Sequence, residues 1–176
     1  MKPAIMHLPH GGGRQVPRMI IIHAMAEYIV ADKATAAKYK IKRGNYHAYR
    51  WLDIAGLSAH CLITPTGAII RPRRDNETAW HARHFNTDSL GIEFLIPVAH
   101  DYSSFLEAMK TDYLTPAAFD AGIDQVRDWL TRYTIDHIKT HSQVDPARKK
   151  DPGPGFPVSR FNEALKRWTS QPIEAA

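Results

Sequence analysis

Arg18-Met19-Ile20-Ile21-Ile22-His23 is a continuous apolar run that ends in a histidine. Its β-branched content is typical of a strand that is buried on both faces of a sheet. Ser89 to Ile96 has a similar apolar content and predicts a second strand. Such strands need helices to cover their faces, so the two stretches predict a layered fold of sheet and helices.

The segments around these strands supply the other elements. Asn45 and Gly56 suit the N-cap and the C-terminal stop of a helix. Thr115-Pro116 is a clear helix start, and Pro65-Thr66-Gly67 is typical of a hairpin turn. We therefore expect helices over residues 45–57 and from Thr115 onward, and strands over residues 58–64, 68–71 and 135–140.

These elements predict an α/β (α+β) fold, a single domain with a central mixed β-sheet flanked by helices. Residues 1–17 are expected to form an irregular lead-in, residues 18–170 the functional domain, and residues 171–176 a tail. Residues 27–45 are expected to be a surface excursion with a short helix. Residues 97–114 are expected to be a surface loop or lid.

Composition bounds the class of protein. The chain has 176 residues, a formal net charge of +5 and a single cysteine, Cys61. One cysteine excludes an intrachain disulfide framework and a cysteine-rich zinc site. The basic balance favours a polyanionic partner, although solubility explains it equally well. No stretch approaches the ~18 apolar residues of a membrane helix, and the N-terminus lacks the apolar run of a secretory signal.

A shaped loop near the C-terminus carries candidate metal ligands. His141 and Asp151 lie ten residues apart, with Lys149 between them, and Pro152-Gly153-Pro154-Gly155 follows. Proline fixes φ and glycine accepts positive φ, so the loop is built to hold one conformation. Together with His23, these residues make two histidines and one carboxylate, a zinc set that leaves a fourth position open for water.

Glu93 is a candidate catalytic residue, because it places a carboxyl group in the otherwise apolar strand over Ser89 to Ile96. A buried unpaired carboxylate costs several kcal/mol or takes up a proton, so a chain that keeps one there usually uses it. Alternation places Glu93 on one face with Gly91 and Leu95, and Gly91 is expected to leave open space beside it. An exposed glutamate, or one paired with an arginine, is the alternative.

Two further histidines are candidates for supporting roles. His60 alternates with Leu62 and Thr64 on one strand, which favours a packed role or one behind the metal ligands over ligation itself. His81 lies in a Trp80-His81-Ala82 motif, where substrate contact and structural support are equally good interpretations.

These motifs resemble the zinc-dependent N-acetylmuramoyl-L-alanine amidases, a family shared by phage lysozyme-type endolysins, muropeptide-recycling amidases and peptidoglycan recognition proteins. The resemblance covers roughly residues 18–168, and its pieces occur in the family's order. They are Ile20-Ile-Ile-His23, Ser58-Ala-His-Cys-Leu-Ile63 with Thr66-Gly67, Ala79-Trp-His-Ala82, Asn86-Thr-Asp-Ser-Leu-Gly-Ile-Glu93, and His141 through Phe156.

The resemblance implies a peptidoglycan hydrolase that cleaves the amide bond between N-acetylmuramic acid and L-alanine. It implies Zn²⁺ bound by His23, His141 and Asp151, with Glu93 and Lys149 as catalytic residues. It also implies that residues 18–170 are the catalytic domain. Some phage members carry a catalytic tyrosine where this chain has Ala59, so that role is absent here or moves to Glu93.

Three alternatives stay open for the activity and its setting. A phage endolysin released through a holin pore is the first expectation, and a cytosolic recycling amidase for anhydro-muropeptides or an injected effector are the others. A binding module without catalysis, or a regulator of a partner enzyme, would use the same fold. We expect a monomer made in the cytoplasm, with no nucleic-acid partner.

The C-terminal segment has an amphipathic pattern with a basic side. Phe161, Leu165 and Trp168 form its apolar stripe, and Arg160, Lys166 and Arg167 lie off the stripe. A helix docked on the core by that stripe is the preferred interpretation. Contact with anionic membranes or lipopolysaccharide is the alternative.

Overall fold

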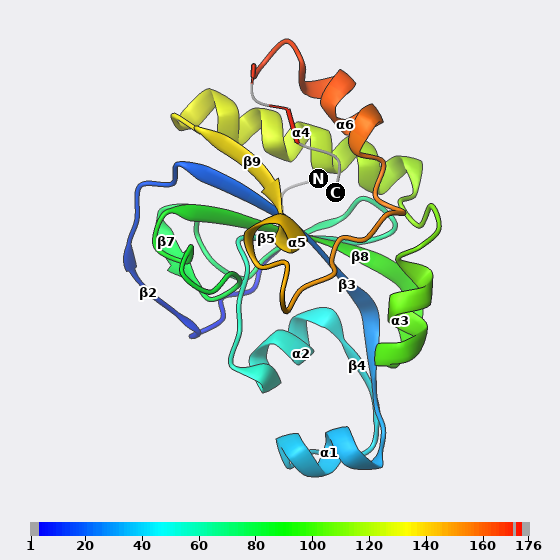
Figure 1. Cartoon of the computed structure of the whole chain (residues 1–176). Coiled ribbons are helices and arrows are strands. Elements are labelled where there is room, and N and C mark those ends of the chain that lie inside the picture. The colour runs from blue at the N-terminus through cyan, green and yellow to red at the C-terminus, as the bar shows by residue number, and fades with distance from the viewer. Residues whose placement is uncertain (1–3, 171, 174–176) are drawn as a thin grey trace.

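Two long parallel strands form the centre of the fold in the computed structural model, which describes residues 4–170 and 172–173 (Figure 1). The strands are β1 Ala4–Ile5, β2 Gly11–Arg14, β3 Met19–Ala31, β4 Gly44–His47, β5 Cys61–Ile63, β6 Ile69–Arg71, β7 Glu77–Ala79, β8 Ser89–His100 and β9 His137–Thr140. The helices are α1 Lys33–Tyr39, α2 Ala48–Ala55, α3 Tyr102–Ala108, α4 Pro116–Arg132, α5 His141–Val144 and α6 Val158–Leu165.

The main sheet is mixed, as the sequence predicts. Its order is β1-β6-β5-β8-β3-β4, and β9 also pairs with β3. Strands β5, β8, β3 and β9 run parallel to one another in the centre. β4 pairs antiparallel with β3, and β6 pairs antiparallel with β5 but parallel with β1. The register of β3 against β8 sets His23 directly opposite Glu93.

Each face of the sheet has its own apolar core. Alternate residues of β3 and β8, including Ile22 and Phe94, pack with Trp129 of α4 and Phe161 of α6. The other face packs Leu95 against Leu52 of α2. Helices therefore cover both sides, and the odd-numbered positions that carry His23 and Glu93 point away from α4.

The central strands are longer than the sequence predicts. Strand β3 continues to Ala31 and β8 to His100, with a register shift between Ala26 and Tyr28. Residues 27–45 therefore hold the end of β3, helix α1 and the start of β4, which together project from the body of the molecule (Figure 1). Residues 97–114 are not a plain loop, because they contain the end of β8 and helix α3.

Two helix starts show where capping signals succeed and fail. Thr115 caps α4 as expected, because its side chain accepts a hydrogen bond from the N–H of Ala118. Helix α2 begins at Ala48 with His47 as the cap, instead of at Asn45, because Asn45 belongs to β4 and pairs with Val30. Gly56 ends α2 in the left-handed conformation, as predicted.

The two ends of the chain are more ordered than expected. Residues 4–5 and 11–14 form strands in the segment expected to be irregular, and Gly11 pairs with Ala79. Part of the expected tail, residues 171 and 174–176, lies outside the described residues, but Ile173 is buried and bonded to Asn162. Among the described residues no helix has the length and apolar content to span a bilayer.

Helix α6 is docked on the core through its apolar stripe. Phe161 and Leu165 are buried, and the Arg160 guanidinium lies 4.5 Å from the centre of the Phe119 ring. Trp168 stays partly exposed under Arg127, 4.1 Å from its ring. The preferred interpretation of this segment therefore agrees with the structure. Its two buried side chains are not available to a membrane in this arrangement.

Candidate active site

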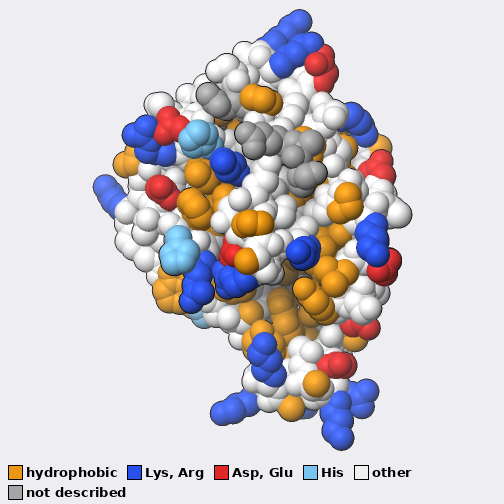
Figure 2. All heavy atoms as spheres, in the orientation of Figure 1, with side chains coloured by type: hydrophobic (Ala, Val, Ile, Leu, Met, Phe, Trp, Pro, Cys, Tyr) orange, Lys and Arg blue, Asp and Glu red, His pale blue; other side chains and the backbone are white. Residues whose placement is uncertain are grey.

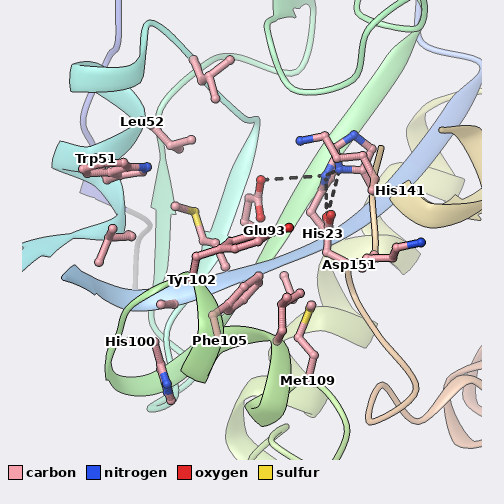
Figure 3. Close-up of a pocket in the computed structure, with 18 of the residues that line it drawn as sticks. His23, Trp51, Leu52, Glu93, His100, Tyr102, Phe105, Met109, His141 and Asp151 are labelled. Atoms are coloured by element: carbon pink, nitrogen blue, oxygen red, sulfur yellow. Dashed lines mark hydrogen bonds and ion pairs between the residues drawn. The ribbon is translucent and has the colours of Figure 1, made fainter. Parts of the chain in front are cut away.

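The three expected metal ligands come from separate elements and meet at one point (Figure 3). His23 lies in the middle of β3, on the face opposite α4. His141 begins α5 directly after β9, which pairs with β3 up to Ile22 and so delivers His141 beside His23. Asp151 lies in the loop after α5, where the N–H of Ser142 donates to its carbonyl.

The ligand atoms are close enough for one cation. His23 Nδ1 lies 2.8 Å from His141 Nδ1 and 3.3 Å from Asp151 Oδ2, and His141 Nδ1 lies 3.0 Å from the same carboxylate oxygen. Tetrahedral zinc with bonds of about 2.0–2.1 Å separates its ligand atoms by roughly 3.3 Å. Two imidazoles and one carboxylate are also the donor types that zinc prefers, so the residues fit the ion.

Burial and hydrogen bonds together keep His23 and Asp151 in the protonation states that a cation needs. Burial, followed by the nearby His141, lowers the pKa of His23 to about 4, so its ring is neutral at pH 7. Burial alone would raise the pKa of Asp151. Its hydrogen bonds to His141 and His23 outweigh that effect and hold the pKa well below its usual range, so the carboxylate is charged.

Glu93 lies beside the three ligands, as its strand register requires. Its Oε1 is 3.9 Å from His23 Nδ1, and its Oε2 is buried without a hydrogen-bond partner among the described residues. Burial, with a further contribution from the Asp151 charge, raises the pKa of Glu93 to about 8. A carboxyl group with this pKa can hold a proton or release it near neutral pH.

The site opens into a cavity between α2 and α3. Lys149 lines it together with the ligand residues and Glu93, and much of the remaining lining is aromatic and apolar (Figure 3). This aromatic and apolar lining includes Trp51, Leu52, Trp80, Tyr102, Phe105 and Met109. The sequence motifs do not indicate Trp51, Tyr102 or Phe105. Trp51 lies in the helix expected over residues 45–57, and Tyr102 and Phe105 lie in the segment expected to be a loop or lid, and neither segment carries a motif of the site.

Basic side chains lie beside this cavity and on the projecting tip, among other parts of the surface. Figure 2 shows Lys and Arg side chains beside the hollow and at the end formed by α1. Arg148, Lys149 and Lys150 line the cavity. Positive charge therefore lies next to the site, and the polyanionic partner and the solubility explanation expected from composition both stay open.

His60 is buried and bonded on both ring nitrogens. Its Nδ1 accepts from the N–H of Gly91 at 2.9 Å, and its Nε2 lies 2.8 Å from the carbonyl of Glu77. Burial lowers its pKa to about 4. The group of ligand atoms that the described residues bring together does not include His60.

His81 lies directly behind His23. Its Nδ1 is 2.9 Å from His23 Nε2, and its Nε2 is 3.2 Å from Ser89 Oγ. The open space expected beside Gly91 is filled by this ring, because a Cβ on Gly91 would lie 2.5 Å from His81 Nδ1. Gly91 is thus needed for the close approach of an imidazole, and it does not enlarge the cavity.

Solved structures of amidases resemble this fold over most of its length. The structure of N-acetylmuramoyl-L-alanine amidase LysC from Clostridium intestinale URNW has a TM-score of 0.67 and 21% identity, over 94% of this chain and 98% of that one. A crystal structure of AmpD has a TM-score of 0.65 and 26% identity, over 92% and 93%. The fold is therefore the amidase fold that the sequence predicts.

The family follows from the sequence match. The profile of the N-acetylmuramoyl-L-alanine amidase family matches residues 12–154, and the chain belongs to this family. The 1,6-anhydro-N-acetylmuramyl-L-alanine amidase AmpD of Enterobacter cloacae is 33% identical over 127 residues, which are 66% of this chain. The chain spans 62% of the length of that relative.

Proposed function

We propose that this chain is a zinc-dependent amidase that cleaves the bond between N-acetylmuramic acid and L-alanine. The observation that carries the proposal is the convergence of His23, His141 and Asp151, with the buried Glu93 at 3.9 Å from His23. A ligand set with an open fourth position beside a carboxyl group is typical of a hydrolytic zinc site. Membership of the amidase family supports the same bond.

The residues divide the chemistry between them. Zinc, when bound, supplies a Lewis acid that polarises the carbonyl and lowers the pKa of water. Glu93 accepts a proton from the attacking water and returns it to the amine of L-alanine as the carbon–nitrogen bond breaks. Lys149 places a fixed positive charge in the cavity, where it stabilises the developing oxyanion. The products are the muramic acid carboxylate and a stem with a free N-terminus.

We place soluble fragments first among the forms of the substrate. The curated AmpD relatives are named as 1,6-anhydro-N-acetylmuramyl-L-alanine amidases. The related AmiD structure holds anhydro-N-acetylmuramic acid-L-Ala-D-gamma-Glu-L-Lys. This evidence favours the recycling alternative and reverses the order expected from the sequence, in which the endolysin stood first. On this interpretation the protein acts on cytosolic fragments as a monomer, without nucleic acid.

One experiment tests the catalytic assignment. Glu93→Gln and Lys149→Met should stay folded and bind zinc, and each should lose about 10²–10³-fold in the rate of L-alanine amine release. Glu93→Gln removes the group that accepts and returns the proton, and Lys149→Met removes the charge that stabilises the oxyanion. Lys42→Met, on the exposed loop after α1, is the matched control and should keep the wild-type rate. Wild-type rates in Glu93→Gln would contradict the assignment.

A second experiment separates the substrate forms and the binding-module alternative. The rate of amine release is compared on intact sacculi and on soluble anhydro-muropeptides. A recycling amidase prefers the fragments, an endolysin prefers the sacculi, and a binding module retains sacculi without releasing amines. Zinc content measured on the same preparation ensures that a silent protein is loaded with the metal.

A further inference from the structure

We propose that His81 is a positioning residue for the metal site. Its ring accepts a hydrogen bond from the Nε2–H of His23 and so directs His23 Nδ1 at the cation. The inference rests on the proposed function, because it concerns the same site. Figure 3 shows His23, His141 and Asp151 pointing toward one another. The second nitrogen of His23 points to the opposite side, where His81 lies.

The two nitrogens of His23 have separate partners. Nδ1 faces His141 Nδ1 at 2.8 Å and Asp151 Oδ2 at 3.3 Å, so it is the ligand atom. A neutral imidazole that gives one lone pair to a metal carries its proton on the other nitrogen. That proton is on Nε2, which lies 2.9 Å from His81 Nδ1. The two rings meet edge to face, with centroids 5.1 Å apart.

The far side of His81 fixes which nitrogen accepts. His81 Nε2 lies 3.2 Å from Ser89 Oγ, and the hydroxyl of Ser89 donates to the carbonyl of Phe85. Since the hydroxyl proton is used on Phe85, Ser89 accepts from His81 Nε2–H, which leaves His81 Nδ1 as an acceptor. In this chain of hydrogen bonds His23 donates to His81, His81 donates to Ser89, and Ser89 donates to the carbonyl of Phe85, so each donated proton has one acceptor.

The backbone around His81 holds the ring in place. The side-chain oxygen of Asn86 accepts from the N–H groups of His81 and Ala82, at 3.0 and 2.8 Å. Gly91 provides the slot for the ring, because any Cβ there would overlap it. A glycine in a buried strand interior is costly, and the close approach of another group is a common reason to keep it.

The identity of the acceptor has a chemical consequence. Metal-bound histidines usually donate to a carboxylate, a carbonyl or water. Here the acceptor is a neutral imidazole, so in the described part of the chain the hydrogen bond from His23 Nε2 adds no negative charge to that of the ligand Asp151. A cation bound here would keep more positive charge than one whose histidine ligand donates to a carboxylate, and this charge favours activation of water.

The test measures zinc affinity by competition with a chelator, which requires no hydrolysis. His81→Leu removes the acceptor and should weaken zinc binding about 10–100-fold. His81→Asn keeps an oxygen near the position of Nδ1 and should restore most of the affinity. His100→Leu is the matched control, because His100 lines the same cavity but bonds to the carbonyl of Pro97; its affinity should equal that of wild type.

Three outcomes would overturn the proposal. The first is wild-type zinc affinity in His81→Leu, and the second is an equal loss in His81→Asn and His81→Leu. The third is a metal-free wild-type protein in which ¹⁵N NMR places the His23 proton on Nδ1. That spectrum needs no variant, so the proposal stays testable if His81→Leu does not fold. A wild type that binds zinc but releases no amine would contradict the proposed function alone.

Discussion

Single residues at this site are controlled by burial more than by local sequence. His23, His60 and His81 are three imidazoles held close together, and burial lowers the pKa of each. Protonating any one of them would place a charge in a region with little solvent. The site therefore keeps neutral rings that can accept hydrogen bonds or bind a cation.

His60 gives a prediction about acid stability. Its pKa is about 4 in the folded state and 6.5 in the unfolded state. Between pH 6.5 and about 4, His60 therefore binds a proton in the unfolded chain but not in the folded protein. The resulting stability is fully present above pH 6.5 and is lost as the pH falls toward about 4. One such group contributes a slope of about 1.4 kcal/mol per pH unit within that range.

The measurement is urea unfolding of the metal-free protein at pH 7, 6 and 5. His60→Gln should be less stable at pH 7, because it loses the bonds to Gly91 and Glu77. Its stability should then fall less steeply with acid than that of wild type. Equal slopes in the two proteins would show that His60 does not titrate in this range.

Glu93 shows how far residue-level reasoning extends. The apolar context of β8 correctly predicts a buried carboxyl group on the face shared with Gly91 and Leu95. It does not predict what Gly91 is for, because the ring that fills the slot comes from His81, ten residues earlier. The surroundings of Gly91 and Glu93 include side chains from other segments, and the sequence next to these two residues does not show which segments those are.

Elements of the fold begin and end where local signals agree with strand pairing. Thr115-Pro116 starts α4 because no strand competes for those residues. Asn45 is also a good cap, but the end of β3 recruits it into β4. The same pairing explains why residues 27–45 contain a strand pair as well as a short helix.

Thr115 gives a prediction at the scale of the element. Its hydroxyl donates to the carbonyl of Pro65 at 2.6 Å and accepts from the N–H of Ala118. It therefore caps α4 and ties this helix to the β5–β6 hairpin. Thr115→Ala should lower the free energy of unfolding by about 1–2 kcal/mol, measured in urea.

The control is a threonine inside α4, away from its cap. Thr131 is exposed and bonds only within α4, to the carbonyl of Arg127. Thr131→Ala should change stability by less than about 0.5 kcal/mol. A similar loss in both variants would mean that the tie to Pro65 and the cap add nothing specific.

At the scale of the whole molecule, the proposed metal site joins three segments. His23 belongs to the sheet, His141 to the start of α5, and Asp151 to the proline-rich loop. A cation that binds all three binds the folded state only. Zinc should therefore stabilise the protein by about 4 kcal/mol when its free concentration is 1,000-fold above its dissociation constant.

Thermal unfolding with and without a strong chelator checks this prediction. Removal of zinc should lower the melting temperature of wild type, and zinc should restore it while Mg²⁺ should not, since Mg²⁺ prefers oxygen ligands. Asp151→Asn should weaken the response to zinc. A melting temperature independent of zinc in wild type would contradict the proposed metal site.

The sequence by itself determined the mixed sheet, the α4 cap, the β5–β6 turn and the identity of the residues that meet at the site. Apolar runs, caps and turn residues are local signals, and the motifs name the chemistry. Only the tertiary structure decided the length of β3 and β8, the aromatic side chains that α2 and α3 contribute to the cavity, and the place of His81 behind His23. The physical reason is that strand register and ring-to-ring contacts join residues that are far apart in the chain. A local sequence pattern does not show which distant residues will meet.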